Sequence, residues 1–271
     1  MTDMAQQIAS PPTTSSVMRA IASKVWTSVF PFIVVIALWQ FASLFFPRFL
    51  FPSLIDVFWR CMDIFSSGVM FWDVMATVLR ILAGLAGAFI IGGILGLIMA
   101  RSKAADKFLS PILTLFQGIP ALSWVVFAII WFHGVEFRIF FIMVMTTLPA
   151  FTFQVIGALR GMSKDLTEMV FSFRPTRLKL FRVMIAPAIL PDILTAWKVN
   201  LGNAARVVVV AELVGATGGV GYQLLQQQLF DMAGALAWTL QLVFFVLIVQ
   251  GALTLIENTA FRYRAVSERA L

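Results

Sequence analysis

Several polar residues interrupt a largely apolar run at residues 188–214, and five of them are the first positions in this chain where chemistry could occur. They are Lys198, Asn200, Asn203, Arg206 and Glu212. Positions 199, 203 and 206 share one face of a helix, because residues three and four apart are neighbours on a helical surface. Asn203 and Arg206 could therefore line one side of a pathway, where Arg206 would attract an anion.

A structural explanation of the same residues stays open. Placing a charged side chain at the centre of a lipid bilayer costs about 2.5–3.5 kcal/mol. Such a residue is therefore expected to have an ion-pair or hydrogen-bond partner, or a functional role. Lys198 could extend to the cytoplasmic edge of a membrane, and Arg206 could pair with Glu212 or with a carbonyl at a helix end. Gln154 and Arg80 are weaker candidates, for which we expect interhelical hydrogen bonds more than contacts with a solute.

Enzyme chemistry has little support in this sequence. The chain contains one cysteine, Cys61, and one histidine, His133. An intrachain disulfide, a multi-thiol metal site and a histidine cluster are therefore excluded. The sequence also lacks the HExxH pattern of metalloproteases and the phosphate loop of nucleotide hydrolases. We expect a chain that is no enzyme, with no catalytic residue, metal or cofactor of its own.

Composition indicates an integral membrane protein. Hydrophobic residues make up 61% of the chain, charged residues make up 12%, and the mean hydropathy is +0.94, far from the balance of a soluble domain. Lipid offers no hydrogen-bond partner to backbone groups, so apolar runs of about 20 residues must span it as helices. The net charge of +7 could suggest nucleic acid. Because the basic residues lie mainly between the apolar runs, as membrane topology requires, we expect no nucleic-acid partner.

Six apolar runs predict an all-α, polytopic bundle of six transmembrane helices. They are residues 26–46, 78–99, 109–132, 139–159, 188–214 and 236–256. Gly118 and Pro120 interrupt the third run, and a proline inside a helix removes one backbone hydrogen bond and kinks it. Because such a kink is tolerated beside a water-filled cavity, Pro120 is a candidate pathway residue.

The distribution of positive charge orients these spans. Fourteen of the twenty Lys and Arg fall in segments assigned to the cytoplasm, whereas three fall outside and three lie within spans. By the positive-inside rule, both termini are then cytoplasmic. Residues 1–20 are expected to form a mobile cytoplasmic tail. Residues 21–271 would form a single transmembrane domain whose first apolar run is retained as an anchor.

A basic, amphipathic segment at residues 163–186 differs from the apolar sequence around it. Four of its apolar residues repeat at helical spacing, which predicts a short helix with one apolar face. They are Leu166, Met169, Val170 and Phe173. Pro175 disfavours helical geometry at Arg174 and suits the start of a second short helix. The two helices could dock a polar partner, although a loop this basic could also act only as a topology signal.

The spacing from Glu168 to Pro187 and Pro191 resembles the conserved cytoplasmic loop of ABC importer permeases. Further segments that look like this family are Ser110-Pro111-Ile112, Ile119-Pro120-Ala121, Ile130-Trp131-Phe132, and Ala211-Glu212-Leu213 through Gly218-Gly219-Val220-Gly221-Tyr222. They are similar to the permeases for nitrate, sulfonates, taurine and bicarbonate, and the resemblance covers roughly residues 30–260. The chain departs from the family where Met169 and Val170 replace two alanines and where Arg174 replaces a glycine.

The resemblance implies a permease subunit with the type I ABC importer fold in the bacterial inner membrane. Its implied partners are a second permease copy, two ATP-binding cassette ATPase subunits that bind ATP and Mg, and an extracytoplasmic substrate-binding protein. We expect a homodimer, and the change at Arg174 keeps a heterodimer open. The implied solute is small and anionic, such as nitrate, a sulfonate or taurine, bicarbonate, or an organic carboxylate.

The resemblance also assigns roles within residues 163–186, whose two short helices would couple the permease to the ATPases. The coupling residues would be Glu168, Met169, Val170, Phe173, Arg174, Pro175 and Arg177, with Met169, Val170 and Phe173 as buried anchors. Arg174, Arg177 and Lys179 would make contacts at the rim. An ion-gradient-driven secondary transporter is the alternative. It requires buried carboxylates near the membrane midplane, whereas this sequence offers only Glu212, near a helix end.

Overall fold

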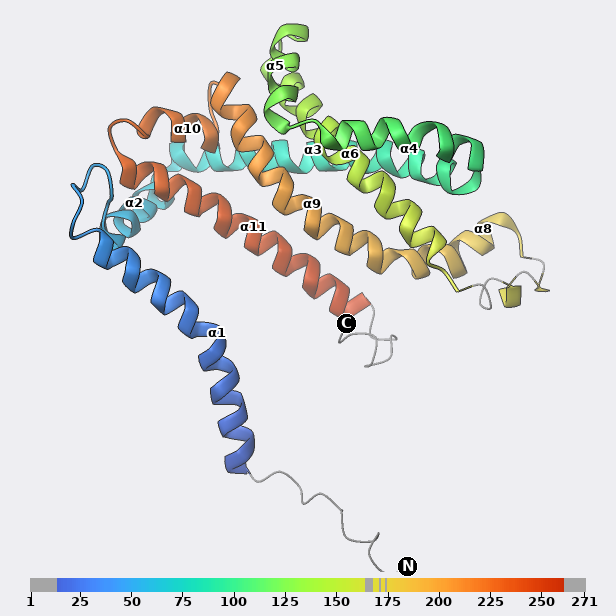
Figure 1. Ribbon diagram of the computed structural model, residues 1–271, viewed down its shortest axis with the longest axis horizontal. Coiled ribbons are helices and arrows are strands. Elements are labelled where there is room, and N and C mark those ends of the chain that lie inside the picture. Colours follow the sequence, from blue (N-terminus) through green and yellow to red (C-terminus); the bar gives the residue numbers. More distant parts are fainter. Residues whose placement is uncertain (1–13, 164–167, 171, 174, 261–271) are drawn as a thin grey trace, which may run out of the picture.

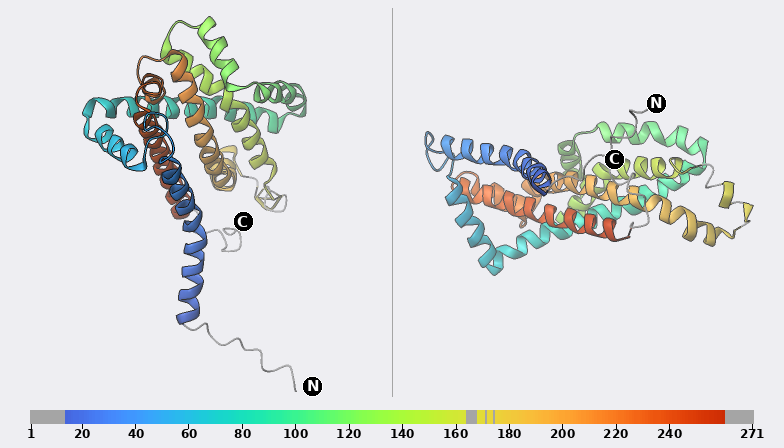
Figure 2. Two further views of the ribbon diagram at one scale, coloured as in Figure 1. Left: turned by 60° about the vertical axis from the view of Figure 1, so that its left-hand side comes forward. Right: turned by 90° about the horizontal axis from the view of Figure 1, so that it is seen from below.

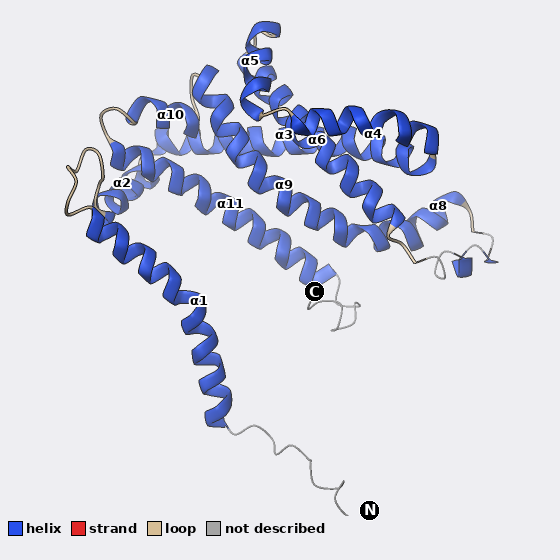
Figure 3. Cartoon of the chain, in the orientation of Figure 1, coloured by secondary structure: helices blue, strands red, loops and turns tan. Residues whose placement is uncertain are grey.

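The computed structural model describes residues 14–163, 168–170, 172–173 and 175–260. The other residues, which include Arg174 and most of the N-terminal tail, lie outside this description. The expectations that concern these residues lie outside it too. The described residues form helices joined by short connections, and none of them lies in a strand (Figures 1 and 3). The expected all-α fold class is confirmed for this part of the chain.

The helices follow one another along the chain with few residues between them. They are α1 (Thr14–Ala42), α2 (Leu54–Ser66), α3 (Gly68–Arg101), α4 (Lys103–Gly118), α5 (Ala121–Trp131), α6 (Val135–Arg160), α8 (Arg177–Leu180), the π-helical turn η1 (Phe181–Ile185), α9 (Ala186–Gly215), α10 (Val220–Gln227) and α11 (Met232–Ala260). The N-terminal half of α1 extends beyond the other helices (Figures 1 and 2). Ser53 caps α2 in a capping box with Asp56, so that each side chain accepts the other residue's backbone N–H.

Among the residues that the structure describes, four helices are long and apolar enough to cross a membrane. They are Phe71–Arg101, Val135–Arg160, Leu178–Gly215 and Met232–Thr259. Together α4 and α5 form a fifth, broken candidate, and the apolar helix Val29–Ala42 within α1 is shorter than a full span. Each expected span thus has a helical counterpart, but the structure does not confirm six complete crossings.

The third expected span is broken and not merely kinked. α4 ends at Gly118, α5 begins at Ala121, and the two helices are bent by 96° at the break. A proline disfavours helical geometry at the residue before it, and Ile119 has extended angles of φ −75° and ψ 123°. Pro120, which is exposed, therefore separates two helices. The interruption expected at Gly118 and Pro120 is thus present, and it is a sharp bend between two helices where a kink within one helix was expected.

The second helix of the basic segment runs directly into α9. After α8, η1 continues as α9, so one helix extends over Leu178–Gly215. In η1 the Ala186 backbone N–H donates to the Phe181 carbonyl, five residues earlier. This wider turn accommodates Pro187, whose ring clashes with the carbonyl four residues before it in a regular α-helix. The second short helix and the fifth expected span at residues 188–214 are therefore parts of one continuous helix in the structure.

The centre of the bundle is formed by α3, α6 and α9. Phe89, Phe151 and Trp197, one from each helix, contact one another with ring centroids 5.5–5.7 Å apart, a spacing typical of stabilising aromatic pairs. α3 and α6 also approach closely at Gly92, where a Cβ would lie 2.9 Å from the Leu148 carbonyl oxygen. Small residues thus set the distance between these two helices.

Candidate functional site

One face of α9 presents polar side chains that no other described part of the chain covers. Val199, Asn203 and Arg206 are exposed there, Val199 by 61%. Arg206 Nε donates to the Gly202 carbonyl of the preceding turn at 3.2 Å, a contact within α9 itself. The structure therefore places the two expected pathway residues on one open helix face.

Other polar residues of α9 contact neighbouring helices. The buried Asn200 amide donates to Gln154 Oε1 on α6 at 2.8 Å, so Gln154 acts here as an interhelical hydrogen-bond partner. Lys198 forms an ion pair with Glu257 on α11, which provides a counter-charge for its ammonium group. α9 is thus bound to α6 and α11 on the sides that do not carry Asn203 and Arg206.

Glu212, near the far end of α9, is fully buried among polar partners. Arg80 Nη1 donates to Glu212 Oε1 at 2.8 Å, and the Gly221 backbone N–H donates to Oε2 at 2.8 Å. The Thr77 hydroxyl lies 2.9 and 3.0 Å from the two carboxylate oxygens. Charge-assisted hydrogen bonds of this kind compensate the desolvation of a buried carboxylate. The alternative in which Glu212 pairs with Arg206 is therefore wrong.

Arg80 connects this carboxylate to a third helix. Its Nε and Nη2 atoms lie 2.9 and 2.5 Å from the Glu136 carboxylate oxygens on α6. Its Nη1 also donates to the Gly218 carbonyl at 2.8 Å. One guanidinium group thus joins α3, α6, α9 and the turn that follows α9. We call Thr77, Arg80, Glu136 and Glu212 the polar clasp.

The turn between α9 and α10 closes over the polar clasp because it contains glycine. Gly219 has φ 113°, a conformation that side chains disfavour, and a Cβ there would lie 2.6 Å from Glu212 Oε1. Asp73 on α3 accepts hydrogen bonds from the Gly219 N–H at 2.9 Å and from the Gln223 amide at 2.7 Å. This turn is therefore held against α3 by several groups.

Sequence reasoning missed the polar clasp as a unit, although the sequence carries part of its signal. Asp73, Thr77 and Arg80 are spaced at i, i+4 and i+7, which places them on one face of α3. A polar stripe on an apolar helix requires polar partners on its neighbours. Glu136 and Glu212, both near helix ends, carry carboxylates that could serve as partners for the polar face of α3.

The first part of residues 163–186 presents apolar side chains outward. Residues 168–170 and 172 are helical, with the Ser172 hydroxyl donating to the Glu168 carbonyl at 3.0 Å. Met169 and Phe173 are exposed, Phe173 by 80%, and Val170 is half-buried. Two of the three expected anchors are thus available to a partner.

The second part of this segment continues the apolar surface. Leu178, Phe181 and Val183 are exposed, and Pro175 is half-buried just before α8. Arg177 begins α8, but its side chain and the whole of Arg174 lie outside the described residues. The rim contacts expected of these arginines stay predictions.

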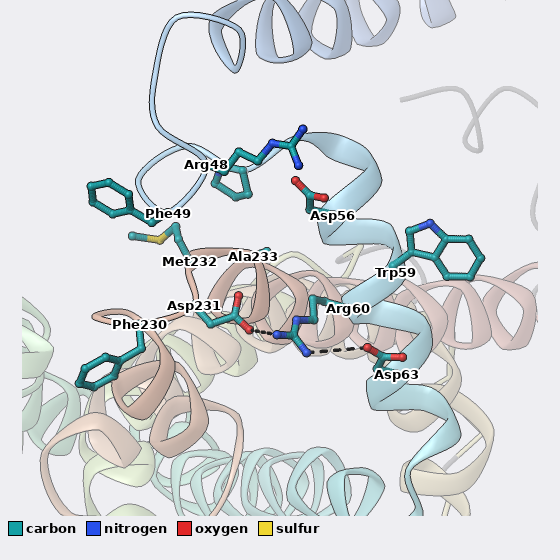
Figure 4. Close-up of a pocket in the computed structure, with 11 residues that line it drawn as sticks. Arg48, Phe49, Asp56, Trp59, Arg60, Asp63, Phe230, Asp231, Met232 and Ala233 are labelled. Carbon is teal, nitrogen blue, oxygen red and sulfur yellow. Dashed lines mark ion pairs between the residues drawn. The ribbon is translucent and has the colours of Figure 1, made fainter.

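A separate pocket of about 410 Å³ lies between the loop after α1, the helix α2 and the start of α11 (Figure 4). Arg60 on α2 forms ion pairs with Asp231 at 2.8 Å and with Asp63 at 3.8 Å, as Figure 4 shows. The described part of the chain contains no cluster of His, Cys, Asp and Glu that could hold a metal ion. We assign neither a solute nor a metal to this pocket.

Comparison with known proteins identifies relatives of this chain. Residues 92–262 match the family described as binding-protein-dependent transport system inner membrane component. The formylaminopyrimidine transport permease protein ThiX of Halalkalibacterium halodurans is 25% identical over 193 residues, which cover 70% of this chain and 76% of ThiX. The nitrate import permease protein NrtB of Leptolyngbya laminosa is 26% identical over 171 residues, which cover 62% of this chain and 59% of NrtB.

The fold also matches a known transporter. A chain of the methionine ABC transporter MetNI, in an inward-facing conformation, superposes with a TM-score of 0.60 at 21% identity, covering 72% of this chain and 100% of that one. The expected type I importer fold and the resemblance to ABC importer permeases are both confirmed. Because the family match covers more than half of the sequence, this multi-pass membrane protein belongs to the binding-protein-dependent transport system inner membrane components, the permease subunits of ABC transporters.

Proposed function

We propose that two copies of this chain form the pathway through which an ABC importer moves a small anionic solute across the bacterial inner membrane. The observation that carries this proposal is the open polar face of α9, where Asn203 and Arg206 are exposed on a membrane-spanning helix. If Arg206 faced lipid, its charge would cost about 2.5–3.5 kcal/mol. A water-filled path between two copies removes this cost because the guanidinium group stays hydrated.

An anion is the solute that this face would attract. The planar guanidinium fork of arginine matches carboxylates and other oxyanions. Among the contacts of the described residues, Arg206 uses only Nε, which leaves its terminal nitrogens for a ligand. The nitrate relative NrtB supports this choice. Because the relative ThiX is named for formylaminopyrimidine, aminopyrimidines are the second class of solute to test.

Two further residues contribute to the same pathway in this proposal. Pro120 is exposed at the break between α4 and α5, where non-helical backbone is tolerated if it lines a cavity. Gln154 would contribute indirectly, because its hydrogen bond with Asn200 fixes α9 against α6.

The energy for transport would come from two partner ATPase subunits, which bind ATP and Mg. Met169 and Phe173 are exposed apolar side chains in the segment expected to couple to them, and apolar helix faces dock in hydrophobic grooves. The helix over Leu178–Gly215 then connects this segment directly to the polar face of α9. An extracytoplasmic binding protein would deliver the solute at the opposite end of the bundle.

The proposed topology places both chain termini and residues 163–186 in the cytoplasm. The support is the distribution of Lys and Arg, fourteen of which fall on that side. The second permease copy would be identical, with a heterodimer as the alternative.

Uptake measurements with charge variants test the pathway. Arg206→Gln should lower uptake of labelled nitrate, taurine, bicarbonate or benzoate, whichever the unaltered transporter carries, more than it lowers membrane abundance. Arg206→Lys should retain part of this uptake, because it keeps the charge without the planar fork. Arg48→Gln, which removes an arginine outside the spans, is the matched control. Uptake that is unchanged in Arg206→Gln at equal abundance would reject the pathway role.

A further inference from the structure

The helix α2 has an inner face that attaches it to α11. Val57 and Ile64 are buried and Cys61 is half-buried, at spacings of four and three residues. The Cys61 Sγ lies 3.9 Å from the Ala237 carbonyl oxygen. Gln241 on α11 donates its amide to the Cys61 carbonyl at 3.1 Å. α2 is therefore held across α11 and does not extend away from the bundle.

The two outer faces of α2 differ sharply in polarity. One face carries Asp56, Arg60 and Asp63, which line the charged pocket in Figure 4. The other face carries the exposed apolar side chains of Ile55, Phe58, Met62 and Phe65, and the exposed Trp59 lies at its border with the charged pocket. A helix with this division fits a boundary between water and lipid, with its charged side in water.

A second hollow lies on the apolar side of α2. It measures about 380 Å³ and runs between α2 and α11. Its lining residues are Cys61, Met62, Phe65, Leu240, Gln241, Val243, Phe244 and Leu247. The nitrogen of the single amide among them, on Gln241, already donates to α2, and the remaining lining is mainly apolar. We call this hollow the α2–α11 groove.

The depth of α2 agrees with a position at the membrane surface. Ala237, which contacts Cys61, lies five residues after Met232, the first residue of α11. At 1.5 Å per residue, α2 crosses α11 about 7.5 Å along the helix axis from the first residue of this candidate span. Helices that lie in a membrane interface bury their apolar face by about 5–10 Å. Leu240 and Leu247 lie further along, within a helix apolar enough to span the membrane.

We propose that α2 lies in the membrane interface and that the α2–α11 groove binds the acyl chain of a phospholipid from the adjoining leaflet. The apolar lining, the continuity of the groove with a membrane-spanning helix and the charged opposite face of α2 together select this occupant. A second copy of the chain fits less well, because the pathway face proposed for dimer contact carries Val199, Asn203 and Arg206, none of which lines the groove.

Photolabelling of the full chain in lipid nanodiscs tests the acyl-chain site. A phosphatidylglycerol with a diazirine in its acyl chain should label residues 61–65 and 240–247 in severalfold excess over Leu255 and Ile256, exposed apolar residues of the same α11. Val243→Trp should fill the groove and remove this excess without changing labelling at Leu255 and Ile256. Labelling without excess, or an excess that survives Val243→Trp, would overturn the site.

Spin labels on α2 distinguish lipid from a protein partner. In a Cys61→Ser background, a label at Phe58→Cys should collide more with dissolved oxygen than with a water-soluble nickel chelate. A label at Asp63→Cys, on the charged face, should show the reverse preference. Protection of the Phe58→Cys label from both reagents would indicate a protein cover, and preference for the nickel chelate would indicate water. Either result would overturn the proposal.

Discussion

Arg80 on α3 and Glu212 on α9 form a 2.8 Å ion pair in which the Glu212 side chain is fully buried. Glu212 lies on the helix that begins at Leu178 in the proposed coupling segment. At 1.5 Å per residue, the two positions are roughly 50 Å apart along one continuous helix. A rigid-body movement of its coupling end must therefore either carry the polar clasp with it or open the clasp.

The first prediction concerns the free energy of unfolding that this ion pair protects. Arg80→Met leaves the buried Glu212 carboxylate without its counter-charge, and breaking a buried pair in this way costs about 3–5 kcal/mol. The double variant Arg80→Met/Glu212→Leu should recover most of the loss, because no uncompensated charge remains buried. Reversible unfolding of the purified chain in mixed detergent micelles measures both changes.

The exposed pair of Arg60 and Asp231 is the control for this experiment. Their side chains are 52% and 30% exposed, and exposed pairs contribute about 0–1 kcal/mol. Arg60→Met should therefore have little effect on unfolding. An equal loss in Arg60→Met and Arg80→Met would show that burial of the pair with Glu212 does not determine its contribution.

The second prediction concerns the turn over the polar clasp. Gly219→Ala forces a side chain into φ 113° and places its Cβ 2.6 Å from Glu212 Oε1. Backbone strain of this kind costs about 1–3 kcal/mol, and displacement of the carboxylate adds to it. Gly93→Ala is the matched control, because nothing lies within 4 Å of its Cβ position. That change should stabilise α3 by about 0.5–1 kcal/mol, and a similar loss in both variants would contradict the prediction.

The sequence predicts the helical class of this fold because a membrane leaves few choices. Apolar runs such as 139–159 correspond closely to α6, since length and hydropathy decide the matter. Proline effects are less predictable. Pro120 signals an interruption, but a single residue does not determine a bend of 96°. The sequence also does not predict η1, the π-helical turn that accommodates Pro187 within one continuous helix.

The polar clasp shows the limit of sequence reasoning more clearly. The spacing of Asp73, Thr77 and Arg80 identifies a polar face, but the partner Glu212 is 132 residues away from Arg80. Glu212 pairs with Arg80 and not with Arg206 because of how α3 packs against α9. The relative position of these two helices cannot be read from a single sequence. Arg206 was a plausible partner for Glu212 by proximity along the chain, and only the packing of three helices excludes it.

The third prediction concerns coupling to the proposed ATPases. The double variant Met169→Asp/Phe173→Asp places charges on two exposed apolar side chains, which should prevent their burial in a hydrophobic groove. Uptake should be lost, and ATP hydrolysis by the assembled transporter should no longer respond to substrate, while membrane insertion stays unchanged. Ser172→Asp adds a charge to the same segment outside the apolar pair and is the control. Uptake that persists in the double variant, or an equal loss in Ser172→Asp, would reject Met169 and Phe173 as anchors.

The last prediction concerns the reactivity of Cys61, the single cysteine of the chain. Burial raises the pKa of the Cys61 thiol above its ordinary value, because a low-polarity environment disfavours the thiolate. Since the thiolate is the reactive form, alkylation by a charged maleimide should be slow near neutral pH. The rate should still rise at pH values above about 8.5, where an ordinary cysteine is already half ionised. Ser66→Cys in a Cys61→Ser background places an exposed thiol on the same helix and should react faster, with a lower midpoint. Equal rates and equal midpoints for the two thiols would show that α2 does not bury Cys61 against α11.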